Sequence, residues 1–147
     1  MTDNSFFEYE VNVARINNYK FEVDFGKDSI ANLLMDESEE VPGGEGAGPS
    51  SSMLLASAVG HCLSASLTFC LSKKQVSLDD LKTKVRFKRQ RNDEGFWRIT
   101  EINVVLNPTI EDKENANFLR CVEIFKKFCI VSGSVESGIP INVDISE

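Results

Sequence analysis

Four cysteines are the residues of this sequence with the most reactive chemistry: Cys62, Cys70, Cys121 and Cys129. Cys62 lies in the middle of a long uncharged stretch, and Cys129 lies where an amphipathic segment meets a Ser/Gly-rich one. One thiol in a helix and a second on a hinge suit a redox pair, in which the first becomes a sulfenic acid and the second condenses with it to a disulfide. Cys70 and Cys121 fit ordinary core packing, because free cysteine is among the most buried residue types.

Arg15 is the best candidate for activating the attacking thiol. The pKa of that thiol must fall from about 8.5, and a neighbouring arginine lowers it without ever losing its own proton. Apolar and polar residues alternate along Phe7–Val13 and Tyr19–Phe25, which predicts a hairpin of two half-buried strands. A three-residue loop keeps the apolar residues of both strands on one face. The same parity places Arg15 on that face at the hairpin tip, where an inward arginine needs a partner.

Metal chemistry receives little support from the sequence. There is no Cys-x-x-Cys pair, and His61 is the single histidine. His61 precedes Cys62, but adjacent residues of a helix point about 100° apart, so His61 is a poor base or co-ligand for that thiol. We interpret His61 as a polar residue of the core or of an interface, and we expect no metal site.

The stretch Gly48–Ser72 has to position Cys62. It carries no charged residue, whereas most surface helices keep a charged face opposite their apolar stripe. The sequence therefore predicts a central helix that is buried on nearly all sides. Ser50–Ser52 supply side-chain oxygens for its amino-terminal cap, and Lys73 suits its carboxyl-terminal end. The stretch is too rich in Ser and Gly for a membrane span.

The remaining segments indicate an α+β fold with antiparallel sheets. Leu81–Arg91 and Phe96–Leu106 read as a second hairpin, with a β-bulge near Thr100 where the apolar positions change parity. Thr109 is a plausible cap of a second helix, and Ile139–Ile145 alternates like a last strand. Antiparallel hairpins with two inserted helices are typical of α+β proteins. A dimer that wraps the apolar helix is the simplest way to cover it.

Composition restricts the function classes. A chain of 147 residues, 41% of them hydrophobic, is long enough for one domain over residues 1–147. A net charge of −7 disfavours nucleic-acid and anionic-membrane partners, which need a positive field. The start of the chain lacks the features of a signal peptide, so we expect a cytoplasmic protein with mostly reduced cysteines. One basic run is interpreted as a solvated sheet face: Lys82, Lys84, Arg86 and Lys88.

Two segments, GPSSSMLLASAVGHCLSASL and FCIVSGSVESGIPINVDI, resemble the OsmC/Ohr family of osmotically induced and organic hydroperoxide resistance proteins. The resemblance covers nearly the whole chain. It implies an intertwined homodimer, with antiparallel sheets wrapped around the central helices and active sites at the subunit interface. It also implies a peroxidatic Cys62, a resolving Cys129, a loose match of Arg15 to the family arginine, and no metal or organic cofactor. A dithiol donor, of the dihydrolipoyl type in one branch, would reduce the disulfide.

The sequence departs from the family pattern at two places. The peroxide reductases of the family carry a glutamate just ahead of the central helix that helps to hold the arginine, and Ser52 or Met53 stands there in this chain. The second cysteine is often followed by proline, and here Ile130 follows it. Glu45, in the Gly-rich loop before the helix, is the available substitute for the missing acid.

Three functions follow in order of preference. The first is a thiol-dependent reductase of organic hydroperoxides that uses Cys62, Cys129 and Arg15. The second is a dimeric stress-response or binding module without efficient turnover, which the absent glutamate favours. The third is a small hotdog-type thioesterase, which also wraps strands around a helix but needs a carboxylate that the central helix lacks.

Overall fold

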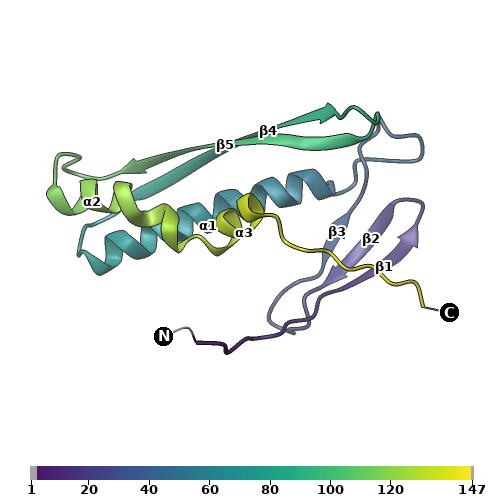
Figure 1. Cartoon of the computed structure of the whole chain (residues 1–147), viewed down its shortest axis with the longest axis horizontal. Coiled ribbons are helices and arrows are strands. Elements are labelled where there is room, and N and C mark those ends of the chain that lie inside the picture. The colour runs from purple at the N-terminus through teal and green to yellow at the C-terminus, as the bar shows by residue number, and fades with distance from the viewer. Residues whose placement is uncertain (1–2, 147) are drawn as a thin grey trace. The chain divides into compact units, whose positions relative to one another are not determined.

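The computed structural model describes residues 3–146. The chain divides into two compact units, Met1–Leu54 and Leu55–Glu147, which are described separately below. The elements in chain order are β1 (Asn12–Asn17), β2 (Lys20–Asp24), β3 (Leu33–Met35), α1 (Ser51–Lys73), β4 (Asp80–Arg91), β5 (Trp97–Thr109), α2 (Ala116–Ile124), the 3-10 helix η1 (Phe125–Phe128) and α3 (Ile130–Ser137) (Figure 1). The architecture is α+β with antiparallel sheets and a long helix, as predicted.

The amino-terminal unit is a three-stranded antiparallel sheet in the order β1-β2-β3. Val13 pairs with Val23, so the apolar residues share a face as predicted. The three-residue loop was wrong. The register instead shifts between Arg15 and Asn17, and Asn18 takes a positive φ of 46° in a tighter turn. A bulge in one strand changes the parity as an odd loop would, which is why the face is the same.

Asp36 organises the loop that leads into α1. Its side chain is buried and accepts hydrogen bonds from the backbone N–H groups of Glu37, Glu45 and Ala47, at 2.8, 3.2 and 3.1 Å. Burial raises the pKa of this carboxyl, but the three hydrogen bonds outweigh burial and lower it overall. The Gly-rich segment is therefore held in place by hydrogen bonds to one carboxylate.

In the carboxyl-terminal unit, β4 and β5 form an antiparallel hairpin that packs on α1 (Figure 1). The register shifts between Lys88 and Arg89, where Thr100 on β5 is left unpaired, so the predicted bulge is confirmed. Gly60 lets the strand approach closely, because a Cβ there would lie 2.5 Å from Cγ2 of Val85. Four positively charged side chains of β4 face solvent, as predicted: Lys82, Lys84, Arg86 and Lys88.

The second helix begins later than predicted. Thr109 is the last residue of β5 and pairs with Asp80, so it does not cap a helix. Asn115 is the cap of α2, and its side chain accepts the N–H groups of Asn117 and Phe118 at 2.9 and 3.2 Å. Ladder hydrogen bonds with β4 extend β5 through Pro108 and override the local helix signal.

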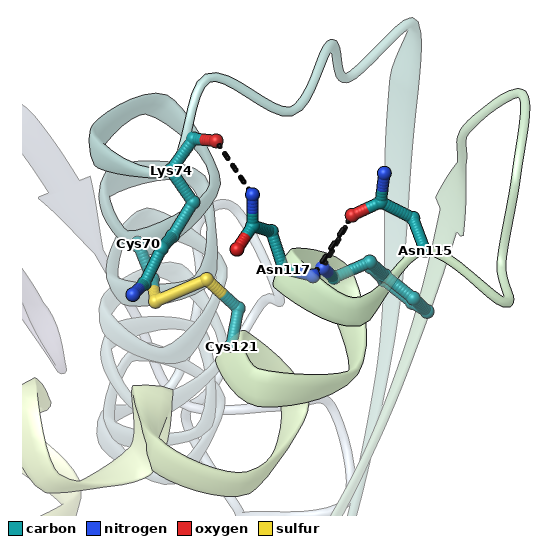
Figure 2. The surroundings of a disulfide bond; sticks show 6 residues. Cys70, Lys74, Asn115, Asn117 and Cys121 are labelled. Atoms are coloured by element: carbon teal, nitrogen blue, oxygen red, sulfur yellow. Dashed lines mark hydrogen bonds between the residues drawn. A yellow bond between two sulfur atoms is a disulfide. The ribbon is translucent and has the colours of Figure 1, made fainter.

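A disulfide between Cys70 and Cys121 ties α1 to α2 (Figure 2). Both residues are buried in the core, as predicted, but the expectation that they are reduced was wrong. Their Cα atoms are 5.7 Å apart across a sequence separation of 51 residues. Cross-linking a loop of this length is worth about 4 kcal/mol by the chain-entropy model. Near the bond, the Asn117 side chain donates to the Lys74 carbonyl at 3.5 Å.

Helix α1 is only partly covered within one chain. It is long and apolar enough to cross a membrane by length and composition, with mean hydropathy 1.6, a test that the core helices of soluble proteins also pass. Of the most apolar 18-residue stretch of α1, 44% is buried. Burial on all sides, as predicted for this helix, is therefore not reached by the described residues of a single chain.

The two terminal segments with strand-like alternation form no strand within the chain. Residues 3–11 and 138–146 carry no regular structure, so the predicted strand over Phe7–Val13 forms only from Asn12 onward, where β1 begins, and the predicted last strand is not formed. Their apolar residues are exposed, with Tyr9 at 84% and Ile145 at 94%. An extended segment needs an edge to pair with, and the described part of this chain supplies none to these residues.

The contact between Gly60 and Val85 gives the first prediction. Gly60→Ala gains about 1 kcal/mol of helix propensity, but forcing a methyl into a filled space costs about 1–3 kcal/mol. We therefore expect Gly60→Ala to lower the free energy of unfolding by about 1 kcal/mol in chemical denaturation. Gly133→Ala in α3, where an added Cβ meets nothing within 4 Å, is the matched control and should stabilise. Gly60→Ala in a Val85→Ala background should also stabilise; a loss there would contradict this steric explanation.

Candidate functional site

Cys62 and Cys129 are the two free cysteines of the described chain, and the structure brings them together. Cys62 lies half-buried on α1, and Cys129 lies between η1 and α3 with an exposed fraction of 3%. Cys129 shares an apolar cluster with Val59 and Leu63 of α1, against which Cys62 also packs. The two thiols hydrogen-bond to each other. The two thiols therefore lie close enough for each to shift the pKa of the other.

Both sulfurs lie at the amino-terminal end of α3. Cys129 caps this helix, and its Sγ accepts the backbone N–H of Ser132 at 3.3 Å. The backbone of Ile130 and Val131 hydrogen-bonds to the Cys62 sulfur. The first N–H groups of a helix have no partner inside the helix and carry its positive dipole end, which favours a thiolate. Gly138 ends the helix with a φ of 75°.

The two thiols differ in acidity. Burial raises the pKa of the Cys62 thiol, and its hydrogen bond to Cys129 raises that pKa further. Burial also acts to raise the pKa of Cys129, but hydrogen bonds from Cys62, from the Ser132 side chain and from the helix backbone lower it overall. The first thiolate of the pair therefore forms on Cys129. This differs from the sequence-based expectation that Cys62 has the lowered pKa.

Ser132 is a site residue that the sequence analysis missed. It is 6% exposed, and its backbone N–H donates to the Cys129 sulfur at 3.3 Å. Its hydroxyl is buried and has no hydrogen-bond partner among the described residues, and it lies near enough to the Cys129 sulfur to lower the pKa of that thiol. The signal that could have revealed it is spacing: a cysteine that caps a helix is stabilised by the residue three positions later.

An apolar cleft of about 550 Å³ lies beside the thiol pair, between α1, β5 and the η1–α3 segment. Val59, Leu63 and Ser132 line it and also surround Cys129, although neither sulfur is part of its wall. The cleft has a charged edge, where Lys126 pairs with Glu136 at 3.0 Å. The walls include Leu55, Val59, Leu63, Ile99, Ile102, Val104, Leu106, Phe125 and Val135. This site suits a small ligand with an apolar body.

Arg15 lies in the amino-terminal unit, whereas both thiols belong to the carboxyl-terminal unit. It stands on β1 opposite Phe21, and its Nε donates to the Asn18 carbonyl at 2.9 Å. Its role in the site stays a prediction. Glu45, the available substitute for the missing acid, forms an ion pair with Lys20, so its carboxylate has a different partner. His61 is exposed on α1.

The family profile of OsmC-like proteins matches residues 43–144. The chain belongs to the OsmC-like family. The match includes α1, the β4–β5 hairpin and both free cysteines, so the resemblance noted in the sequence is confirmed. No significant match was found among curated proteins.

Solved structures show the same fold. An OsmC-like protein from Mycoplasma pneumoniae is 16% identical to this OsmC-like protein, with a TM-score of 0.73 over 95% of this chain and 96% of that one. One from Vibrio cholerae is 14% identical, with a TM-score of 0.73 and coverage of 89% and 95%. An organic hydroperoxide resistance protein from Elizabethkingia anophelis is 12% identical, with a TM-score of 0.68 and coverage of 90% and 91%. At these identities the likeness concerns the fold alone.

The asymmetry of the thiol pair in this OsmC-like protein gives the second prediction. In the protein with Cys62 and Cys129 reduced, Cys129 should be alkylated from a lower pH than Cys62, as read by peptide mass spectrometry with ultraviolet thiolate absorbance. Ser132→Ala removes a hydrogen bond to the thiolate and should raise the pKa of Cys129. Ser137→Ala, on the exposed side of the same helix, is the control and should leave it unchanged. Ionisation of Cys62 first would contradict the assignment.

Proposed function

We propose that this protein is a thiol-dependent reductase of organic hydroperoxides. The observation that carries the proposal is the hydrogen-bonded Cys62–Cys129 pair at the amino-terminal end of α3, beside an apolar cleft. Several structures with this fold are named organic hydroperoxide resistance proteins, including one from Bacillus subtilis with a TM-score of 0.64 and 16% identity. The cytoplasmic location stays a prediction.

The reaction begins with one proton shared between two sulfurs. Cys62 passes its proton to the Cys129 thiolate, and the resulting Cys62 thiolate attacks the outer oxygen of the hydroperoxide. A sulfur–oxygen bond forms, the O–O bond breaks, and the alkoxide leaves and takes a proton from solvent. Cys129 thus acts as the base that activates Cys62. Arg15 is assigned to stabilise the thiolate and polarise the O–O bond.

Resolution and reduction complete the cycle. The Cys129 thiol condenses with the Cys62 sulfenic acid, forming a Cys62–Cys129 disulfide and releasing water. The two thiols interact in the reduced state and pack in one apolar cluster, which supports this pairing. An external dithiol, of which a dihydrolipoyl group is the expected type, then exchanges with the disulfide and is itself oxidised to a disulfide.

The cleft favours organic substrates over hydrogen peroxide. Its volume of about 550 Å³ is within the range of small-molecule sites. Each methylene group that enters an apolar site gains about 0.8 kcal/mol, so an aromatic or alkyl hydroperoxide binds more tightly than hydrogen peroxide. Nothing in the apolar wall offers hydrogen peroxide a comparable gain.

We also propose that two chains assemble as an intertwined homodimer. The alternating segments at both ends of the chain have exposed apolar residues and no partner strand within the described residues, and about half of α1 is uncovered. A second copy supplies both the missing edges and the missing cover. Interfaces of this kind, where each chain completes the fold of the other, are typical of obligate dimers.

The third prediction concerns the reaction. With cumene hydroperoxide and a dithiol, wild-type protein should turn over and Cys62→Ser should be inactive. Cys129→Ser should form one sulfenic acid per chain more slowly than wild type, because the base is lost, and should then stop. Arg15→Met should lower kcat/KM by about 10²–10³-fold, as loss of one stabilising group does in other enzymes. Arg15→Lys should retain part of the activity, because it keeps the charge. Equal activity in wild type and Cys62→Ser would overturn the mechanism.

A binding or stress-response module without turnover is the alternative, favoured by Ser52 or Met53 at the position of the family acid. One equivalent of peroxide, followed by mass spectrometry, distinguishes the two. Loss of two hydrogens, mapped to the Cys62–Cys129 pair, supports the reductase. Unchanged thiols support the module.

The fourth prediction concerns the dimer. Light scattering after size exclusion should give the mass of two chains, and Ile141→Asp with Ile145→Asp should shift the protein toward one chain, because both apolar side chains lie on the same face of the segment. Asn142→Asp adds a charge on the opposite face and is the matched control. A wild-type protein that stays monomeric at micromolar concentration would contradict the proposed dimer.

A further inference from the structure

The four cysteines form two antiparallel pairs between the same two segments. Cys70 lies eight residues after Cys62 on α1, and Cys129 lies eight residues after Cys121 along α2 and η1. Cys70 bonds to Cys121, and Cys62 hydrogen-bonds to Cys129. Eight residues of helix span about 12 Å, so the disulfide and the thiol pair lie about two helical turns apart along α1.

A short segment connects the disulfide to Cys129. Three residues of α2 follow Cys121, and the four residues of η1 then lead directly to Cys129. The Cys129 backbone N–H donates to the Lys126 carbonyl at 3.2 Å, which fixes the end of this segment. Phe125 in its middle packs against both apolar clusters, the one around the disulfide and the one around Cys129. A shift of Cys121 along α1 would therefore move Cys129 as well.

We propose that the Cys70–Cys121 disulfide is a positioning element for the redox pair: it fixes the register of α2 and η1 along α1 and so sets the effective concentration of the Cys129 thiol at Cys62. This inference rests on the redox pairing of Cys62 with Cys129 in the proposed function, but it does not require that peroxide be the oxidant. Neither cysteine of the disulfide touches the reacting sulfurs.

Because the disulfide holds Cys121 on α1, less conformational entropy is lost when Cys129 bonds to Cys62. Two thiols react fast and bond strongly when the fold holds them in reactive geometry, because little freedom is left to lose. Without the disulfide, the buried contacts of Leu67, Leu71 and Phe118 still hold α2 on α1. The helix can then shift along α1, and each shift moves Cys129 away from Cys62.

The experiment measures the effective concentration directly. Wild type and Cys70→Ala/Cys121→Ala are equilibrated in glutathione redox buffers, and the fraction of Cys62–Cys129 disulfide is read by alkylation and peptide mass spectrometry. We expect the effective concentration to fall at least tenfold in the variant. The same value in both proteins would overturn the proposal.

A matched control separates positioning from stability. Leu67→Ala removes a buried side chain from the cluster around the disulfide but keeps the disulfide itself. It should lower the melting temperature while leaving the effective concentration of the Cys62–Cys129 pair within about twofold of wild type. A tenfold loss in Leu67→Ala as well would show that general stability, and not the disulfide, controls the pair, and would overturn the proposal.

The reverse measurement covers the case in which the double variant does not fold. Coupling between two sites is reciprocal, so the Cys62–Cys129 disulfide must strengthen the Cys70–Cys121 disulfide by the same factor. Cys62→Ala should therefore make Cys70–Cys121 at least tenfold easier to reduce than in the oxidised wild type. Equal resistance to reduction would overturn the proposal. These buffers contain no peroxide, so a wild type without peroxidase activity overturns the proposed function and leaves this inference standing.

Discussion

Helix α1 carries no charged side chain before its last turn, and this constraint determines how the carboxyl-terminal unit is built. A helix without a polar face has to be covered, because its apolar surface gains about 25 cal/mol for each Å² removed from water. The β4–β5 hairpin covers one side of α1. There the Val85 side chain packs closely over Gly60, and the hydroxyl oxygens of Ser64 and Thr83 are hydrogen-bonded at 2.6 Å. The α2–η1–α3 segment covers another side (Figure 1), and less than half of the apolar 18-residue window of α1 is buried by the described residues.

Covering α1 creates an electrostatic problem for Cys62. A buried thiol resists ionisation, since burial penalises the charged form. The structure answers this with backbone groups: the amino-terminal end of α3 is directed at both sulfurs, and its N–H groups are already oriented. Burial therefore keeps the pKa of Cys62 raised, whereas hydrogen bonds lower the pKa of Cys129. A thiolate can then form on Cys129 although its surroundings are apolar.

Local signals in the sequence predicted local features well. The alternation predicted the first hairpin and its shared face, and the change of parity near Thr100 predicted the bulge. The lack of charge in the central stretch predicted α1. Each of these features depends on residues that are neighbours in the chain, or on strands joined by one turn, so the pattern alone contains the information.

Features that depend on distant partners could not be read in this way. The ladder with Asp80 decides that Thr109 belongs to β5, and the docking of α2 on α1 decides that Cys70 meets Cys121 across 51 residues. The lowered pKa of Cys129 depends on where α3 begins. The fold decides this starting residue, and the amino-acid composition of the segment does not. The strand-like ends of the chain alternate correctly but lack an edge within the described residues.

The missing acid of the family can be understood from the same contacts. A glutamate ahead of the central helix would act by holding an arginine near the thiol, which requires two mobile side chains to be ordered. The end of α3 supplies its positive partial charge from the backbone, without side-chain entropy to lose. Cys129 lies within hydrogen-bond reach of Cys62 and can take its proton, the task for which a lowered pKa is otherwise needed. In the mechanism that we propose, the second thiol serves as both base and resolving group, so the placement of Cys129 matters more than the identity of the residue at position 52 or 53.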